Sequence, residues 1–450
     1  MGKDFEQVKG TVVKTDNAIQ EQNDKFQSPE YKRSRGVYMA QCTFEYLLSL
    51  LVTDAFLTKV LSHLGLDDTT IGIISSFITL AFVIQIFSLF LYKVKMKSKT
   101  VTLIFYSISR LLFASLYVIP FIPIGSATVK VMAMSFILVA YFSKYLILNV
   151  LYKWANSYVS PSNRASYSAT KEIISIATGI IFTAAVGYIF DEMEANGNIE
   201  HGFIMIAILA FIIATVDIIC LFLIKEEQTP PVNNTERKHF KDIIKNTLGN
   251  KNFRSVILFT AIYDTSVYMT QGFLGTFKVK DLLISVFIIQ VFNIVGNITR
   301  MAVSRPLGRF SDKHSFAAGM SVALATLAVA YLTIVFTTPK TWPLIAVYTI
   351  LRAVATAGLN QNTFNIAYSY VDSNYITEAL AIKNCIGGLC GFGASLIGSR
   401  ILKYVQSNGN SIFGIELYGQ QLLGGISFVL VLVALAVMVF VVGKQKVMKQ

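Results

Sequence analysis

Charged residues are scarce in this chain. Asp, Glu, Lys and Arg make up 14% of its 450 residues, whereas hydrophobic residues make up 54% and the mean hydropathy is +0.57. A soluble globular domain carries roughly 25% charged residues, because its surface faces water. The composition therefore excludes an ordinary soluble enzyme or binding domain and indicates an integral membrane protein.

Residue types that bind metals or carry out catalysis are also few. The four cysteines fall inside apolar stretches without the spacing of a disulfide framework or a metal site, so we expect packing roles for Cys42, Cys220, Cys385 and Cys390. The four histidines lie in loops or near the ends of apolar stretches, at His63, His201, His239 and His314. The phosphate-binding pattern G-x-x-x-x-G-K-[ST] is absent. We therefore expect no enzyme, no ATP-driven pump, and no metal or cofactor.

Two further patterns are missing. The first 36 residues contain no apolar segment, so we expect no cleavable signal peptide. Strict alternation of apolar and polar residues is also absent, which disfavours a β-barrel. The chain instead contains twelve long apolar stretches, and an α-helix of about 20 residues crosses the hydrocarbon core of a bilayer. We predict transmembrane helices at 37–62, 70–92, 100–123, 131–156, 169–190, 202–224, 254–276, 281–303, 316–337, 341–370, 379–402 and 419–443.

Acidic residues are outnumbered by basic ones, which gives a formal net charge of +13. With twelve helices, the basic residues gather on one side of the membrane, in the first 36 residues, in 93–99, in 225–254 and in the tail. The opposite loop 191–201 is acidic. By the positive-inside rule, this arrangement predicts a multi-pass protein of the plasma (inner) membrane with both termini in the cytoplasm. Topology therefore accounts for the basic excess, and we expect no nucleic-acid partner.

One loop does not follow this pattern. The loop after the seventh predicted helix carries Lys278 and Lys280, although the topology places it on the acidic side. The loop after the first helix lies on the same side and carries Asp67 and Asp68.

The sequence repeats itself at an offset of 212 positions. The tripeptide Ser-Tyr-Val at 157–159 recurs at 369–371, and Lys171 corresponds to Lys383 at the same offset. Agreement of several residues at one offset indicates an internal duplication rather than a chance match.

The same shift lays the basic loop 93–100 over 305–312, so each half contains six helices in the same order. An even number of helices makes the two repeats parallel, related by an axis along the membrane normal. The predicted fold class is an all-α integral membrane protein with twelve transmembrane helices in two parallel six-helix repeats. The predicted units are a cytoplasmic segment 1–36, a first bundle 37–224, a cytoplasmic linker 225–253, a second bundle 254–443 and a tail 444–450.

This architecture resembles the major facilitator superfamily, in particular its bacterial members. The family signature G-x-x-x-D-[RK]-x-G-[RK]-[RK] is matched in its first half by Gly308, Asp312 and Lys313, whereas Ser315 and Phe316 depart from it. The second copy of this signature, expected before the third helix, is absent, and the fifth helix lacks the Gly-Pro motif of drug antiporters. The resemblance implies a monomeric secondary transporter that moves a small solute by alternating access.

The resemblance also implies roles for the helices. Helices 1, 4, 7 and 10 would line a central cavity, and helices 2, 5, 8 and 11 would form gates. Lys171 and Lys383 would lie near the cytoplasmic starts of helices 5 and 11, and Asp312 would meet the positive N-terminus of helix 5 near Ser168 and Lys171. The alternative is that both lysines extend toward the membrane surface without a gating role.

Ionisable residues inside the predicted helices are candidates for coupling to protons. Glu45 shares a helical face with Tyr38, Gln41 and Ser49, whereas Asp54 lies nine residues further and is expected on the opposite face. Asp264 lies near the middle of helix 7, on one face with Tyr268 and Gln271. We rank Glu45 first for the cavity and name Asp264 and Asp54 as the other two candidates.

Polar and aromatic residues recur at helical spacing in helices 4 and 10 and should face the bundle interior. Amides and phenols suit a polyhydroxy compound, and two cations would also suit an anion. The alternative is that these groups only join helix to helix by hydrogen bonds. The candidate substrate-binding residues are Tyr38, Gln41, Tyr141, Lys144, Tyr145, Asn149, Tyr152, Tyr268, Gln271, Arg352, Gln361 and Asn365.

We predict that Glu45 pairs with Lys144 across helices 1 and 4, as in sugar–proton symporters of the family, and that Asp264 pairs more weakly with Arg352. A solute that rearranges such a pair can couple proton binding to transport. The prediction is proton-coupled symport of a sugar or glycoside. The alternatives are transport of an organic anion, uniport without protons, or a receptor on the same fold. Arg110 and Asp217 lie on outer helices, where we expect a structural pair.

Overall fold

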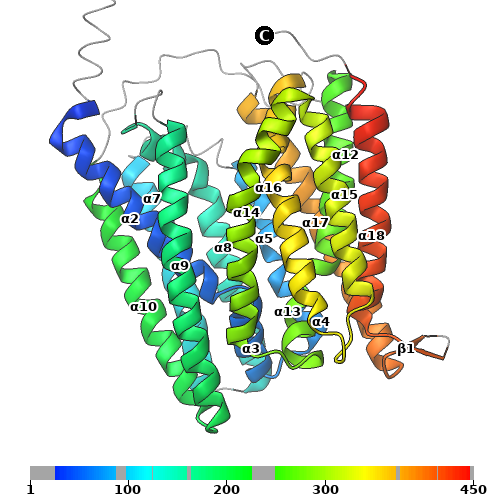
Figure 1. Ribbon diagram of the computed structural model, residues 1–450. Helices are drawn as coiled ribbons and strands as arrows, with labels where there is room; N and C mark the ends of the chain where they lie inside the picture. The colour runs from blue at the N-terminus through cyan, green and yellow to red at the C-terminus, as the bar shows by residue number, and fades with distance from the viewer. Residues whose placement is uncertain are drawn as a thin grey trace, which may run out of the picture.

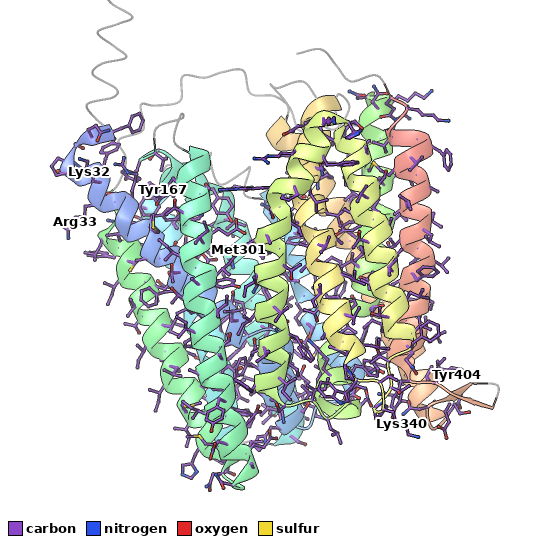
Figure 2. All side chains as sticks on the ribbon, viewed as in Figure 1. Lys32, Arg33, Tyr167, Met301, Lys340 and Tyr404 are labelled. Atoms are coloured by element: carbon purple, nitrogen blue, oxygen red, sulfur yellow. The ribbon has the colours of Figure 1, made fainter. Side chains whose placement is uncertain are left out.

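A computed structural model describes residues 26–87, 98–123, 125–159, 164–225, 249–370, 376–412 and 414–445 (Figure 1). The first half of the chain forms one helical bundle and the second half forms another beside it. The start of α2 and the end of α18 lie at the same end of the molecule, which we call the terminal face. The other end, which carries the exposed Lys340 and Tyr404 (Figure 2), is called the opposite face.

The first bundle contains six crossings, of which three are interrupted or end in a short 3-10 segment. Its elements are α2 Pro29–Leu51, α3 Asp54–His63, α4 Asp68–Ser75, α5 Phe77–Ile84, η1 Gln85–Phe87, α7 Ser98–Ser115, η2 Leu116–Phe121, α8 Ser126–Asn156, α9 Arg164–Ala195 and α10 Ile199–Leu223.

The second bundle repeats this order and adds a short β-hairpin on the opposite face. Its elements are α12 Lys251–Gln271, α13 Leu274–Thr276, η4 Phe277–Asp281, α14 Val286–Lys313, α15 Phe316–Val335, α16 Leu344–Tyr370, α17 Ile376–Ser407, β1 Ser411–Ile412, β2 Ile415–Glu416, α18 Gly419–Val437 and η6 Met438–Val442.

Nine helical segments in the described residues are long and apolar enough to cross a membrane. The remaining three crossings are α2 with α3, α12 with α13, and α16, which give the twelve predicted helices in all. Long helices carry exposed apolar side chains on their outer faces, such as Ile181 of α9 (73% exposed) and Phe222 of α10 (64% exposed). Apolar side chains at such positions are suited to lipid rather than to water.

The offset of 212 is exact for only part of the chain. Helices α9 and α17 both contain 32 residues, and their first and last residues differ by 212 positions. The N-caps of the second and eighth crossings, Asp67 and Ser285, differ by 218 positions, because the preceding loops of the two halves differ in length. Residues 93–97 of the basic loop 93–100 lie outside the described residues, so its alignment with 305–312 stays a prediction.

The first crossing is broken at Val52 and Thr53. Helix α2 ends at Leu51, and α3 restarts at Asp54, whose φ of 51° lies in the left-handed region that non-glycine residues rarely adopt. The Thr53 hydroxyl donates to the carbonyl of Ser49, which satisfies an acceptor at the helix end. The second and seventh crossings have milder interruptions, between α4 and α5 at Ser76 and between α12 and α13 at Gly272 and Phe273, where the backbone keeps right-handed helical angles. Interrupted helices place backbone polar groups and side chains at a membrane interior, where transporters bind solutes.

Side-chain caps fix the starts of several helices on the opposite face. The Asp67 carboxylate accepts hydrogen bonds from the Thr69 hydroxyl and from the hydroxyl and backbone N–H of Thr70 at the start of α4. Partial burial would raise the pKa of Asp67, but these hydrogen bonds hold it below its usual range. The cap therefore stays charged and stabilises the N-terminus of α4 at neutral pH.

Candidate functional site

The predicted pair of helices 1 and 4 is formed in the structure. Lys144 Nζ, from α8, lies 2.7 Å from Glu45 Oε1, from α2, and each side chain is 17% exposed. Both residues lie in uninterrupted helices, so the helical periodicity of the sequence placed them correctly. An ion pair this far inside a membrane protein is a candidate functional site.

Two further charged residues extend this pair into the first bundle. Arg110 Nη2 lies 3.1 Å from Glu45 Oε1, and Arg110 Nε lies 2.5 Å from Asp217 Oδ2. The predicted pairing of Arg110 with Asp217 is therefore present, and Arg110 also contacts Glu45. Two carboxylates and two cations make the cluster neutral overall, which limits the cost of placing it inside the membrane.

Neutral side chains complete the hydrogen bonding of the cluster. The Gln41 amide donates to Asp217 Oδ1 at 2.8 Å and to Glu45 Oε2 at 3.4 Å, and the Tyr106 hydroxyl lies 3.3 Å from both Glu45 oxygens. Gln41 is fully buried, so the structure places this predicted substrate-binding residue inside the cluster rather than in a cavity. The Arg110 and Asp217 side chains are 2% and 0% exposed, which leaves Glu45 and Lys144 as the accessible part.

A cavity of about 230 Å³ lies between the two bundles. Four predicted substrate-binding residues line it, namely Tyr141, Tyr268, Gln271 and Arg352. The other lining residues are Thr53, Asp54, Leu57, Thr58, Ser75, Ile78, Gly272, Leu274, Gly275, Lys278, Asn293, Ile345, Tyr348 and Thr349. All three interrupted crossings contribute, so the helix breaks and the cavity coincide.

Asp54 lines this cavity, and Glu45 does not. The expected ranking of the two acids is therefore reversed for the cavity. Helical spacing from Glu45 does not extend to Asp54, because the helix is broken between them. Asp54 forms an ion pair with Lys278 of the second bundle, and its other oxygen accepts a hydrogen bond from Asn293 at 3.3 Å. Asp54 thus lines the cavity and also forms an ion pair between the two halves.

Further polar contacts join the halves at the opposite face. Lys280 Nζ lies 2.6 Å from Asp68 Oδ1, and Gln406 donates to the other oxygen of Asp68 at 2.9 Å. The Asp191 carboxylate of α9 accepts hydrogen bonds from the backbone N–H groups of Val286 and Phe287, at the start of α14. A carboxylate at a helix N-terminus is favoured by the helix dipole.

Sequence reasoning missed these contacts, although one signal was present. Lys278 and Lys280 do not fit the charge rule for their loop, and the structure gives each an acidic partner in the first bundle. A basic residue in a loop on the acidic side of the membrane can therefore indicate an ion pair with an acidic residue of the other bundle.

Four more of the predicted substrate-binding residues lie outside the cavity lining, among those whose side chains the structure describes. The Tyr38 ring lies under the Lys171 ammonium, at 5.3 Å, and Tyr145 packs edge-on against Phe82. Asn149 accepts a hydrogen bond from Gln85 at 3.0 Å, and the Tyr152 side chain is 47% exposed. The side chains of Gln361 and Asn365 lie outside the described residues.

The structure does not bring Asp264 to Arg352 as predicted. The Asp264 carboxylate instead occupies the space beside Gly387 of α17, where a Cβ atom would clash with it. Lys383, one turn earlier on α17 and 8% exposed, is the cation that acts on Asp264. Lys383 of α17 thus supplies the positive charge that the prediction assigned to Arg352 of α16.

The predicted gate residues of α14 lie in a helix rather than in a loop. Helix α14 extends to Lys313, ten residues beyond the predicted end, and includes Gly308 and Asp312. Asp312 and Lys313 are exposed, and within the described residues no hydrogen bond or ion pair joins Asp312 to Ser168 or Lys171. The gating role of these residues stays a prediction.

Other contacts join the halves nearer the terminal face. Arg300 of α14 lies 3.0 Å from the Glu172 carboxylate of α9, and Asn384 of α17 contacts Gln85 at 3.5 Å. Gly388 of α17 faces the carbonyl of Thr79 of α5 and leaves no room for a Cβ atom there. Helix α17 therefore approaches α5 closely at Gly388.

These features define a class of protein: a helical membrane transporter of two similar bundles, with a cavity between them and polar contacts that join them. A comparison with protein-family models matches residues 37–395 to the Major Facilitator Superfamily, and the chain belongs to that family. No curated protein matches the chain.

Solved structures of other transporters share the fold. The chain is similar to the nucleoside transporter NupG, with 15% identity, a TM-score of 0.65, and coverage of 93% of this chain and 100% of that one. A bacterial homolog of the human lysosomal transporter Spinster, in an inward-facing and unoccupied conformation, matches with 13% identity, a TM-score of 0.63, and coverage of 92% and 96%. The fucose:proton symporter FucP of E. coli matches with 15% identity, a TM-score of 0.50, and coverage of 91% and 98%.

Proposed function

We propose that this transporter carries a small polar solute together with protons, and that Glu45 is the proton-binding residue. The observation that carries the proposal is the ion pair of Glu45 and Lys144, the accessible part of an otherwise buried cluster of four charges. Protonation of Glu45 would release Lys144, because a neutral carboxyl no longer holds the ammonium by charge. The two helices that carry the pair could then move relative to each other.

We further propose that the solute is a sugar or a glycoside. The cavity supports this class, because Tyr141 and Tyr268 offer flat rings and phenols while Gln271 and Asn293 offer amides. Rings and directional hydrogen bonds are suited to a sugar ring and its hydroxyl groups. Nucleosides are glycosides, so the cargo named for NupG falls within this class, as does the fucose named for FucP.

We propose that the terminal face is cytoplasmic, in the plasma (inner) membrane. The support is the basic excess of the segments near that face. In this orientation, the contacts of Asp54 with Lys278 and of Asp68 with Lys280 close the outer side of the cavity. A single copy contains both bundles and the whole cavity, which supports a monomer.

The alternatives differ in testable ways. An organic anion as cargo is favoured by Arg352, a cation that lines the cavity. Uniport would need no proton site, and the neutral four-charge cluster would then be structural. A receptor would bind its ligand without moving it.

The direct experiment is to reconstitute the protein into liposomes and to record internal pH during addition of sugars, nucleosides, carboxylates and amino acids. We expect one compound class to drive protons into the vesicles, and Glu45→Gln to abolish the signal. A pH signal that survives Glu45→Gln would contradict the role of Glu45. Solute uptake without any pH change would leave uniport as the function.

A further inference from the structure

The cavity carries more positive than negative charge. Among the described residues that line it, Asp54 is the one carboxylate, whereas Lys278 and Arg352 are both cations. Asp54 forms its ion pair with Lys278. Within the described residues, no carboxylate lies within ion-pair distance of Arg352. Asp54 acts on Arg352 by charge from beyond ion-pair distance, but it is already paired with Lys278. The cavity therefore keeps one unmatched positive charge, which is costly inside a membrane protein and calls for an explanation.

A buried hydroxyl beside Arg352 also lacks a partner. Tyr348 lies one helical turn before Arg352 on α16, lines the same cavity and is only 4% exposed. Its hydroxyl has no hydrogen bond of good geometry among the described residues, and its near neighbours are Arg352 and the buried hydroxyl of Tyr331. The Arg352 guanidinium lies 5.9 Å from the centre of the Tyr348 ring. The guanidinium and the Tyr348 hydroxyl can therefore contact the same anionic group of a ligand. A buried polar group without a partner is rare and often marks a binding site.

These donors require an acceptor with negative charge. A guanidinium binds carboxylate and phosphate oxygens in pairs, through a fixed fork of N–H groups. The phenol of Tyr348 can add one hydrogen bond to the same oxyanion, because its donor is unused. Neither group gains as much from a neutral hydroxyl.

The rest of the cavity is suited to a small hydroxylated body. Tyr141 of α8 and the residues Tyr268 and Gln271 of α12 supply neutral polar groups to the lining. The volume of about 230 Å³ is below the roughly 300 Å³ at which pockets for drug-sized ligands begin. The solute is therefore small, about the size of one sugar ring.

We propose that the cavity binds a small hydroxylated organic acid, and that Arg352 and Tyr348 hold its anionic group. A sugar acid or a sugar phosphate has this chemistry. The inference rests on the proposed function, because it assigns the class of solute carried through the same cavity. It narrows a sugar or glycoside to one that bears a carboxylate or a phosphate.

The test is a binding measurement that does not depend on proton movement. Purified protein is titrated calorimetrically with D-glucuronate and D-gluconate as carboxylates, D-glucose 6-phosphate as a phosphate, and D-glucose and methyl glucoside as neutral compounds. The variants are Arg352→Gln, which removes the charge, Arg352→Lys, which keeps it without the fork, and Tyr348→Phe, which removes the hydroxyl. Lys340→Gln removes one exposed cation from the opposite face and serves as the charge-matched control.

We expect at least one acid to bind wild-type protein more tightly than both neutral compounds. Its Kd should rise roughly tenfold to a hundredfold in Arg352→Gln, less in Arg352→Lys and Tyr348→Phe, and not in Lys340→Gln. Glucuronate and glucose 6-phosphate separate a carboxylate site from a phosphate site. Thermal unfolding of each variant shows whether it folds, and Tyr348→Phe tests the site if Arg352→Gln does not.

The inference is overturned if no acid binds, or if acid binding is unchanged in both Arg352→Gln and Tyr348→Phe. Its failure can be told apart from failure of the proposed function. Neutral sugars that bind and drive protons, with no binding of acids, leave the proposed function standing. Acids that bind through Arg352 but move no protons support the inference and contradict proton coupling.

Discussion

Lys144 Nζ lies 2.7 Å from Glu45 Oε1, and the two residues belong to different helices of the same bundle. Arg110 contacts the same Glu45 oxygen from a third helix, so one carboxylate holds two cations. Protonation of that carboxylate would weaken contacts among three helices at once. This arrangement explains how binding of a proton can be linked to movement inside one bundle.

The buried part of the cluster should be essential for stability. Arg110→Leu leaves the Asp217 carboxylate without its cation, at a position with no exposure to solvent. We expect a loss of about 3–5 kcal/mol in the free energy of unfolding, because an unpaired charge stays buried. Thermal unfolding in detergent measures the change. The double variant Arg110→Leu with Asp217→Leu should recover most of the stability, and equal instability of the single and double variants would argue against the pair.

The contact of Asp54 with Lys278 should keep the outer side closed. We expect Lys278→Gln to expose the cavity to the outside, because the charge attraction between the bundles is lost. The measurement is labelling of Ser75→Cys, a cavity-lining position, by a membrane-impermeant maleimide in protein whose four native cysteines are replaced by serine. Labelling should become several-fold faster in Lys278→Gln and stay slow in Lys340→Gln. Equal rates in both variants would rule out a closing role for Lys278.

The stability of the folded protein should depend on pH through Asp281. Burial raises the pKa of Asp281 to about 6, helped by the nearby Asp68 carboxylate and opposed by Gln420 and Lys280. A pKa above the unfolded value favours the protonated form in the folded state. The stabilisation is therefore complete below about pH 4 and is lost as pH rises through 6.

The unfolding temperature of wild-type protein should accordingly fall between pH 4 and pH 7 relative to that of Asp281→Asn, which cannot ionise. Both proteins are measured side by side across this range, so the other titrating groups affect them alike. A constant difference between the two curves would show that Asp281 does not contribute.

Close packing of α17 against α5 should limit the residues tolerated at Gly388. A Cβ atom at Gly388 would overlap the carbonyl of Thr79, whereas nothing lies within 4 Å of a Cβ at Gly393. We expect Gly388→Val to reduce solute uptake at least tenfold, since overpacking forces the bundles apart. Gly393→Val is the matched control and should keep uptake within about twofold of wild type. Similar activity of the two variants would contradict a close contact in the working protein.

Much of the fold could be predicted from the sequence. The twelve crossings follow from apolar length alone, and the pair of Glu45 with Lys144 follows from periodicity along continuous helices. The duplication was visible because Ser-Tyr-Val and a following lysine recur at an offset of 212, and the last residues of α9 and α17 differ by the same number.

The cavity could not be predicted in the same way. Asp54 faces it because the chain breaks at Val52 and Thr53, and a helix break changes the direction of every residue beyond it. The position of Asp264 beside Gly387 and under the charge of Lys383 depends on how α12 packs against α17, which is a property of packing and not of spacing along one helix. Neither feature has a periodic signal in the sequence.

The central claim is that Glu45 couples the solute to protons. Its most direct test compares two transport modes of Glu45→Gln in liposomes, with the solute that gives the strongest response in the pH screen. We expect exchange of labelled for unlabelled solute to stay within about tenfold of wild type, because a fixed neutral residue resembles the protonated state. Accumulation driven by a proton gradient should be lost. Accumulation that persists in Glu45→Gln would contradict the account.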